Sequence, residues 1–113
     1  MVLYVMTWDL PTHREQLTVY ANKARNDWIP TVLRHPGVEE FRTFRNPLES
    51  TPQVMVTIEF DSLDSWRSFI ESDDNRRIMR ELRIIGATNV AAQVWSPSTI
   101  TPATERSARE ASR

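Results

Sequence analysis

The chain has 113 residues, a length typical of one domain, and its 14 basic and 15 acidic residues leave a net charge of −1. This balance provides no electrostatic footprint for nucleic acid or an anionic membrane, so we expect neither partner. The chain has no cysteine, which excludes disulfides, thiolate metal sites and cysteine nucleophiles. We expect a cytoplasmic protein, because the start lacks a signal-peptide pattern and no run approaches the ~20 apolar residues of a membrane span.

The first predicted element is a strand over residues 2–10, which are dense in β-branched and aromatic types and end before a proline. Alternate residues would form its two faces, with Val2, Tyr4, Met6 and Trp8 on one side and Leu3, Val5 and Thr7 on the other. Both faces are largely apolar. A strand of this kind is expected to be covered on both sides.

A helix is predicted to begin at Thr12, whose hydroxyl can cap free N–H groups while Glu15 reaches back to the start of the helix. Apolar residues then recur at helical spacing and form one stripe: Leu17, Tyr20, Ala21, Ala24 and Trp28. Pro30 has no N–H group and disfavours helical geometry at Ile29. The helix is therefore predicted to kink or break there, with a further turn after it.

A tight turn is predicted at His35-Pro36-Gly37, because proline suits its second position and glycine can take the positive φ of its third. Residues 38–46 then alternate imperfectly as a strand, and the loop over 46–52 predicts a hairpin with a strand over 53–60. The strand over residues 53–60 alternates cleanly, with Val54, Val56, Ile58 and Phe60 on one face and Met55, Thr57 and Glu59 on the other. Its apolar face is expected to lie under helices.

A second helix can be capped by Asp61 or Ser62, and it presents apolar residues on its first two turns: Trp66, Phe69 and Ile70. Asp73 and Asp74 favour the start of a further helical segment, which carries Ile78, Met79, Leu82 and Ile85. Gly86 is expected to end that segment in the left-handed conformation.

A last strand is predicted over residues 89–97, where a proline stops it. From Pro97 onward the chain is polar and has too few apolar residues to offset the entropy of ordering. We therefore expect one domain over residues 1–96 and a flexible polar tail over residues 97–113.

The order of elements, β-α-β-β-α-β, predicts a ferredoxin-like α+β fold with two helices on one face of a four-stranded antiparallel sheet. The other face would carry Met55 and Thr57, together with Gln93 and Trp95, where no helix of the chain reaches. An exposed apolar sheet of this size would promote aggregation in a monomer. We therefore expect a homodimer in which two such sheets pack face to face as a barrel.

Two segments resemble the dimeric ferredoxin-like α+β barrel superfamily, namely HPGV before an edge strand and VTIEFDSLDSWRSFIESD across a strand–helix junction. The superfamily includes antibiotic biosynthesis monooxygenases, haem-degrading monooxygenases and uncharacterised stress-linked proteins, and the resemblance covers residues 2–96. It implies a cofactor-independent monooxygenase-like enzyme acting on a small aromatic or polyketide-type molecule. The alternatives are a stress-related barrel protein that binds a small molecule without turning it over, and a structural module with a filled core.

The resemblance also implies that haem is not a cofactor. The haem-degrading members carry in this segment an aromatic pair three residues apart, a Ser-Asp, and then a histidine that ligates iron. Trp66 and Phe69 match the pair and Ser72-Asp73 is retained, but Met79 stands at about the histidine position. We expect Met79 to be a core residue, and we expect no cofactor.

A cleft between helix and sheet is the candidate ligand site. Its candidate residues are Tyr4, Trp8, Arg42, Phe44, Glu59, Trp66 and Phe69. Arg42 could hold a carboxylate or phenolate in a bidentate manner, and a buried Glu59 would need a partner or a raised pKa. The alternative is that the aromatic pair is ordinary core and that the arginine pairs with a glutamate or lies in solvent. His13 and His35 show no ligand spacing, so we expect no metal site and assign no catalytic residue.

Overall fold

The computed structural model describes residues 1–98 and 100, and its centre is one antiparallel sheet. The sheet has the strand order β2-β3-β1-β4, with β1 (Val2–Asp9), β2 (Val38–Arg45), β3 (Val54–Phe60) and β4 (Thr88–Trp95). All three pairings between neighbours are antiparallel. The predicted ferredoxin-like α+β fold is therefore confirmed.

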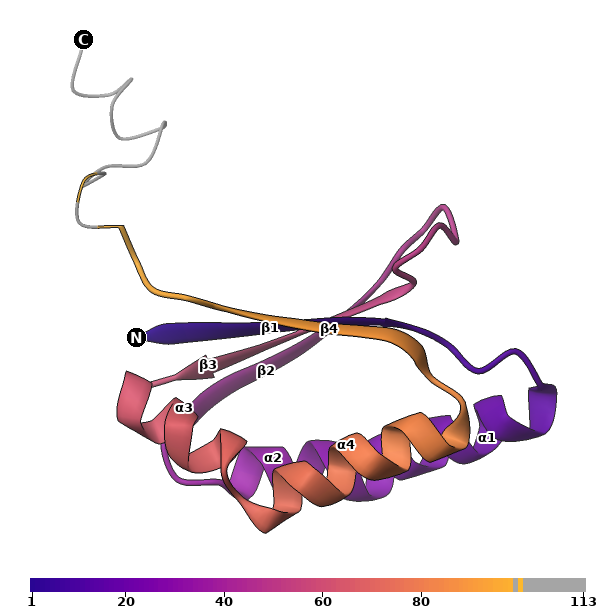
Figure 1. Ribbon diagram of the computed structural model, residues 1–113, viewed down its shortest axis with the longest axis horizontal. Coiled ribbons are helices and arrows are strands. Elements are labelled where there is room, and N and C mark those ends of the chain that lie inside the picture. The colour runs from indigo at the N-terminus through magenta and orange to yellow at the C-terminus, as the bar shows by residue number, and fades with distance from the viewer. Residues whose placement is uncertain (99, 101–113) are drawn as a thin grey trace, which may run out of the picture.

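The helices of the described residues all lie on one face of this sheet, and none of them lies on the other face (Figure 1). They are α1 (Arg14–Lys23), the π-helical segment η1 (Ala24–Trp28), α2 (Ile29–Arg34), α3 (Leu63–Ile70) and α4 (Asp73–Ile85). The helical face of the sheet carries the core, because alternate residues of β1 and β3 are buried along their whole length. Phe60 is completely buried, which places the centre of the core at the end of β3.

The start of the first helix differs from the prediction. His13 is the N-cap residue, with an extended backbone and no side-chain capping bond. The predicted cap by Thr12 with a reciprocal contact from Glu15 is therefore wrong, because Thr12 lies one residue before the position from which a hydroxyl reaches the free N–H groups.

The sequence predicted a kink or a break at Pro30, and the break does not occur, since the chain keeps helical backbone geometry from α1 through α2. The π-helical segment η1 precedes the proline, and the N–H group of Ile29 donates to the carbonyl of Ala24, five residues earlier. A proline cannot make the usual bond to the carbonyl four residues back. We infer that the wider turn accommodates Pro30 without interrupting the helix.

Three further predictions are confirmed, namely the turn at Gly37, the cap at Ser62 and the end of a helix at Gly86. Gly37 has a φ of 88°, and a Cβ built there would lie 2.3 Å from Oγ of Ser65, so both the turn and the α3 contact require glycine. Ser62 caps α3, as predicted, by accepting from the backbone N–H of Ser65. Ser72 caps α4 in the same way, a cap that the sequence analysis did not assign. Gly86 ends α4 with a φ of 115°.

The face of the sheet away from the helices carries the residues that alternate with the buried ones along each strand. Leu3, Val5 and Met55 are half-buried there, whereas Phe44 and Trp95 are 44% and 56% exposed. The register pairs Trp95 with Leu3 and Phe44 with Met55, so these residues share one surface. We call it the open face. The predicted uncovered apolar surface is thus present, and the dimer that would cover it stays a prediction.

Among the described residues, no helix is both long enough and apolar enough to cross a membrane. The predicted polar tail begins at Pro97, and most of it lies outside the part of the chain that the structure describes.

Candidate functional site

A cavity of about 570 Å³ lies between the sheet and the helices. Its floor comes from β1, β2 and β3, and its roof from all the helical segments. The wall is mainly aliphatic and aromatic, with Met6, Val56 and Ile58 below and Val32, Phe69 and Ile78 above. A cavity of this size and character is typical of a site for a small apolar ligand.

The floor changes character along the strands. Cross-strand pairing arranges the helix-facing residues of these strands in three rows, of which all residues but Tyr4 border the cavity: Tyr4–Ile58–Phe41, Met6–Val56–Thr43 and Trp8–Val54–Arg45. The first row is aromatic and aliphatic, whereas the last ends in the guanidinium of Arg45 on the edge strand β2. The cavity therefore has an apolar end, and a second end, which we call the polar end, at the row of Trp8 and Arg45.

Tyr20 on α1 stands above this polar end. The indole Nε1 of Trp8 donates a hydrogen bond of 3.1 Å to the Tyr20 hydroxyl, and the rings of Tyr20 and Trp28 meet edge to face with centroids 5.8 Å apart. Burial raises the pKa of Tyr20, although the bond from Trp8 and the charge of Arg45 oppose this in part. Tyr20 is therefore protonated at neutral pH. Its oxygen already accepts a bond, which leaves its proton for another partner.

Trp28 also borders the cavity, from η1. It is only 6% exposed, and its indole N–H is buried with no hydrogen-bond partner among the described residues. A buried N–H of this kind costs free energy unless an acceptor reaches it. The roof thus presents an unused donor close to Tyr20.

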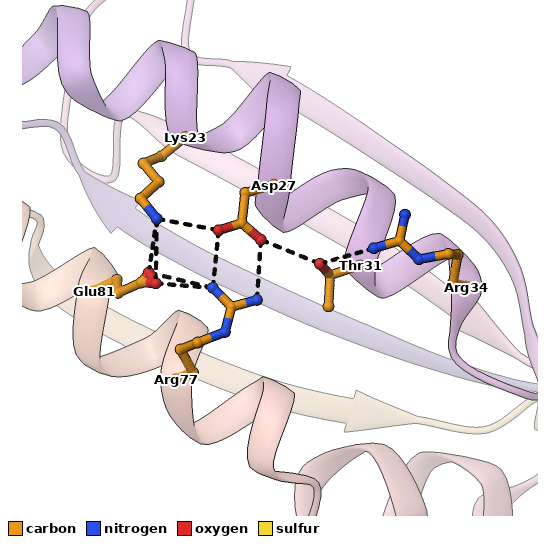
Figure 2. A network of polar contacts seen from close by, with 6 residues as sticks. All are labelled: Lys23, Asp27, Thr31, Arg34, Arg77 and Glu81. Carbon is orange, nitrogen blue, oxygen red and sulfur yellow. Dashed lines mark hydrogen bonds and ion pairs between the residues drawn. The ribbon is translucent and has the colours of Figure 1, made fainter.

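An ion-pair network holds the roof together beside Trp28, and Figure 2 shows its side chains converging between the first helix and α4. Asp27 of η1 accepts two bonds from Arg77 of α4, at 2.9 and 3.0 Å, and one from Lys23 at 3.1 Å. Glu81 accepts from Arg77 at 2.8 Å and from Lys23 at 3.3 Å. The Thr31 hydroxyl donates to Oδ1 of Asp27 at 3.2 Å.

The network shifts the pKa of each carboxyl group. The Arg77 guanidinium beside Asp27 lowers the pKa of that carboxyl strongly, and the pKa of Arg77 is raised in return. Burial raises the pKa of Glu81, but the bonds from Arg77 and Lys23 outweigh it and lower the pKa. The bidentate pair joins η1 to α4, so we infer that it helps to position the neighbouring Trp28 over the cavity.

The predicted site residues do not all meet at this cavity. Trp8, Phe44 and Phe69 border it. Tyr4 and Trp66 lie outside it and pack against each other edge to face, with ring centroids 5.9 Å apart.

The two predicted charged residues lie on the other side of the sheet. Arg42 and Glu59 belong to the open face, where Arg42 is exposed and forms an ion pair with Glu40. Glu59 is half-buried and stands opposite Glu40 in the register. The alternative expectation for this strand, an arginine paired with a nearby glutamate, describes Arg42. Met79 packs against the core, as expected, and also borders the cavity.

The cavity brings in residues that sequence reasoning did not assign to a site, namely Tyr20, Arg25, Trp28 and Arg45. Tyr20 and Trp28 belong to the predicted apolar stripe of the first helix, which was a usable signal. Arg45 was hidden by a bulge between Val38 and Glu40, because the bulge reverses the parity of the rest of β2. Strict alternation counted from Val38 would therefore place Arg42 on the helical side, whereas the register places Arg45 there. Among the described residues, no group of three or more histidine or acidic side chains could hold a metal ion.

No protein-family model matches the chain, and a comparison with curated proteins finds no match. Solved structures do resemble it. HapK from Hahella chejuensis superposes with a TM-score of 0.70 at 13% identity, over 92% of this chain and 99% of that one. A mutant of SnoaB, a cofactor-independent oxygenase from Streptomyces nogalater, gives 0.65 at 16% identity, over 90% and 97%.

A third similar structure is a DABB family protein with a ferredoxin-like fold from Mesorhizobium loti, with a TM-score of 0.68 at 12% identity, over 86% of this chain and 96% of that one. Identities this low establish the architecture and carry no residue roles. The chain therefore has a ferredoxin-like α+β fold, and its likeness to these proteins extends to the fold alone.

Proposed function

We propose that this protein binds a small, flat aromatic or polyketide-type molecule in the cavity between its helices and sheet. The observation that carries the proposal is the cavity itself, about 570 Å³ with a mainly apolar wall and a few polar groups, among them Tyr20 and Arg45. Sites for small ligands commonly combine an apolar body with a few polar groups that fix orientation. A filled structural module would have no such space.

A second candidate function is cofactor-independent oxidation of the bound molecule, in the manner of an antibiotic biosynthesis monooxygenase. In such a reaction a ring methylene and O₂ become a carbonyl and water, so the substrate itself supplies the electrons. The polar end supports this candidate, because Tyr20 and Arg45 could stabilise a phenolate or enolate. The likeness to SnoaB, described as a cofactor-independent oxygenase, points the same way.

We rank binding above oxidation because oxidation needs a proton acceptor. Oxidation requires a group that accepts a proton from the substrate, and no carboxylate or histidine is found among the described residues that border the cavity. Solvent at the mouth would have to accept it. A non-enzymatic role needs no such group.

We also propose that two copies pair through their open faces. The support is the set of half-buried and exposed apolar residues on that face, including Val5, Met55 and Trp95, which lie together on the strands without a covering element. A twofold axis would cover both copies at once. We place the protein in the cytoplasm, in keeping with its lack of cysteine.

Thermal shift and tryptophan fluorescence with a panel of quinones and polycyclic phenols test the binding proposal, since Trp8 and Trp28 border the cavity. We expect hits to stabilise the wild-type protein. Ala24→Phe, which fills the cavity from η1, should abolish the response, whereas Ser68→Phe at an exposed position of α3 should not. Oxygen consumption with each hit then separates turnover from binding. A panel with no hit, or hits insensitive to Ala24→Phe, would refute binding in this cavity.

A further inference from the structure

The polar groups around the cavity are unbalanced, because the charged ones are all cations and several neutral ones can only donate. Arg25 and Arg45 border the cavity, and neither forms an ion pair with another described residue. The indole of Trp28 is a donor without acceptor capacity, and a guanidinium likewise only donates. Tyr20 has a hydroxyl whose oxygen already accepts from Trp8. Each of these groups calls for an acceptor.

Acceptors are few on the same wall. No aspartate, glutamate or histidine occurs among the described residues that border the cavity. Asn75 and Thr43 are its other polar side chains, and Asn75 donates its amide N–H to the carbonyl of Ile70 at 3.2 Å. A ligand that brings its own acceptor oxygen would therefore meet more partners here than a ligand that brings a donor.

The donors are also placed together. Trp8, Val54 and Arg45 form one row across three strands, and Tyr20 lies over Trp8 at hydrogen-bonding distance. The Trp28 ring touches that of Tyr20, and its N–H is buried and unpartnered. Arg45 lies in the same row as Trp8, two strands away, and borders the cavity as Tyr20 does. The remaining wall is mainly apolar, with Phe69, Ile78 and Leu82, and Asn75 and Thr43 are its polar members.

We propose that the cavity is specific for aromatic molecules that carry an anionic oxygen, a carboxylate or a phenolate, which binds at the polar end through the Tyr20 hydroxyl and the Arg45 guanidinium. The Trp28 ring forms part of the wall beside Tyr20 at this end. The aromatic body lies toward Phe69 and Ile78. This inference rests on the proposed binding function and adds the chemical class of the ligand. Charge-assisted bonds of this kind are stronger than neutral ones, particularly away from bulk water.

The test compares two molecules of nearly equal shape, 2-naphthoate and neutral 2-naphthamide, by isothermal titration calorimetry at neutral pH. We expect naphthoate to bind about tenfold more tightly, as one hydrogen-bonded charge would produce. Because Arg45 is exposed to solvent, Arg45→Met should weaken naphthoate binding by about fivefold to tenfold, and naphthamide, whose carbonyl oxygen is uncharged, by clearly less. Tyr20→Phe should also weaken naphthoate selectively. The matched control is Arg67→Met, an exposed arginine of α3 outside the cavity.

A phenol arm separates the two sources of the anionic oxygen. 4-Nitrophenol absorbs visible light only as its phenolate, so its spectrum reports its own ionisation in the complex. If phenolates are ligands, the bound phenol should ionise at lower pH than the free phenol, and Arg45→Met should reduce that shift. Naphthoate preference without such a shift would identify a carboxylate as the recognised group.

The outcomes separate this inference from the function on which it rests. If naphthamide binds as tightly as naphthoate, or if Arg45→Met weakens both equally, the anion specificity is refuted while binding in the cavity stands. If neither compound nor any member of the earlier panel binds, both proposals fall. A wild-type preference for naphthoate that Arg45→Met and Tyr20→Phe each reduce, and that Arg67→Met does not, supports the specificity.

Discussion

The two faces of β3 differ in how they are covered, although their residues alternate along one strand. Val54, Val56, Ile58 and Phe60 are at most 7% exposed under the helices, whereas Met55, Thr57 and Glu59 on the open face are half-buried by their neighbours on the sheet alone. The helical face reaches native burial within one chain. The open face does not, although it also carries large apolar side chains.

This difference shows that a face covered by helices can still enclose a cavity, and that an uncovered face is a separate case. The helices cover the sheet completely at Phe60 but leave a cavity above Val56 and Val54, where α1 carries small residues such as Ala21. On the open face, none of the helices that the structure describes forms a covering layer. We therefore assign ligand binding to the helical face and self-association to the open face.

The largest expected effect comes from removing a side chain on the helical face. Phe60→Ala should lower the free energy of unfolding by about 3–5 kcal/mol, because it removes a completely buried aromatic ring and leaves a cavity. Urea denaturation measures the loss. Phe44→Ala is the matched control on the opposite face, where the ring is 44% exposed, and it should cost about 1 kcal/mol or less. Equal losses would contradict the assignment of the two faces.

A smaller effect is expected from the network that fastens η1 to α4 above the cavity. Asp27→Asn should destabilise the fold by about 1–2 kcal/mol, a range reduced because the Asp27 side chain is 29% exposed. Asp64→Asn is the control, since Asp64 is 95% exposed and lies 3.8 Å from its partner Arg67. This control should change stability by less than about 0.5 kcal/mol.

The same carboxylate predicts how stability depends on pH. The pKa of Asp27 is lower in the folded chain than its ordinary value of 3.8, so the folded state binds fewer protons there than the unfolded state. Its contribution is present above that value and is lost progressively as the pH falls below about 4. Urea unfolding at a series of pH values between 7 and 2 should show this loss. The free energy of unfolding should fall less steeply with decreasing pH in Asp27→Asn than in the wild-type protein. Parallel curves for the two proteins would show that Asp27 does not contribute.

The smallest effect on the chain itself is expected on the open face. Met55→Lys should change the free energy of unfolding of a single chain by about 0.5 kcal/mol or less, because the site is only half-buried. It should nevertheless convert a dimer to monomer or aggregate, since an unpaired charge would enter the interface. Analytical ultracentrifugation measures the change. A dimer that survives the substitution would show that another surface forms the interface.

Much of the architecture was predictable because it depends on local rules. The alternation of β3, the glycine at position 37 and the serine cap of α3 each follow from a few neighbouring residues. The site was less predictable. Arg42 and Arg45 are indistinguishable by composition, and the bulge after Val38 turns Arg45 to the helical side and Arg42 away from it. No feature of the residues at the bulge indicates it.

The order of polar and apolar residues by itself determined the strands, the helices, the apolar face of β3 and the uncovered character of the opposite face, because each depends on periodicities of two or 3.6 residues. Only the tertiary structure decided which side chains surround empty space. The joining of Tyr20, Trp28 and Arg45 at one end of a cavity depends on strand register and on a π-helical turn beside Pro30. Register and helix packing arise from contacts between distant segments, and no short stretch of sequence encodes them.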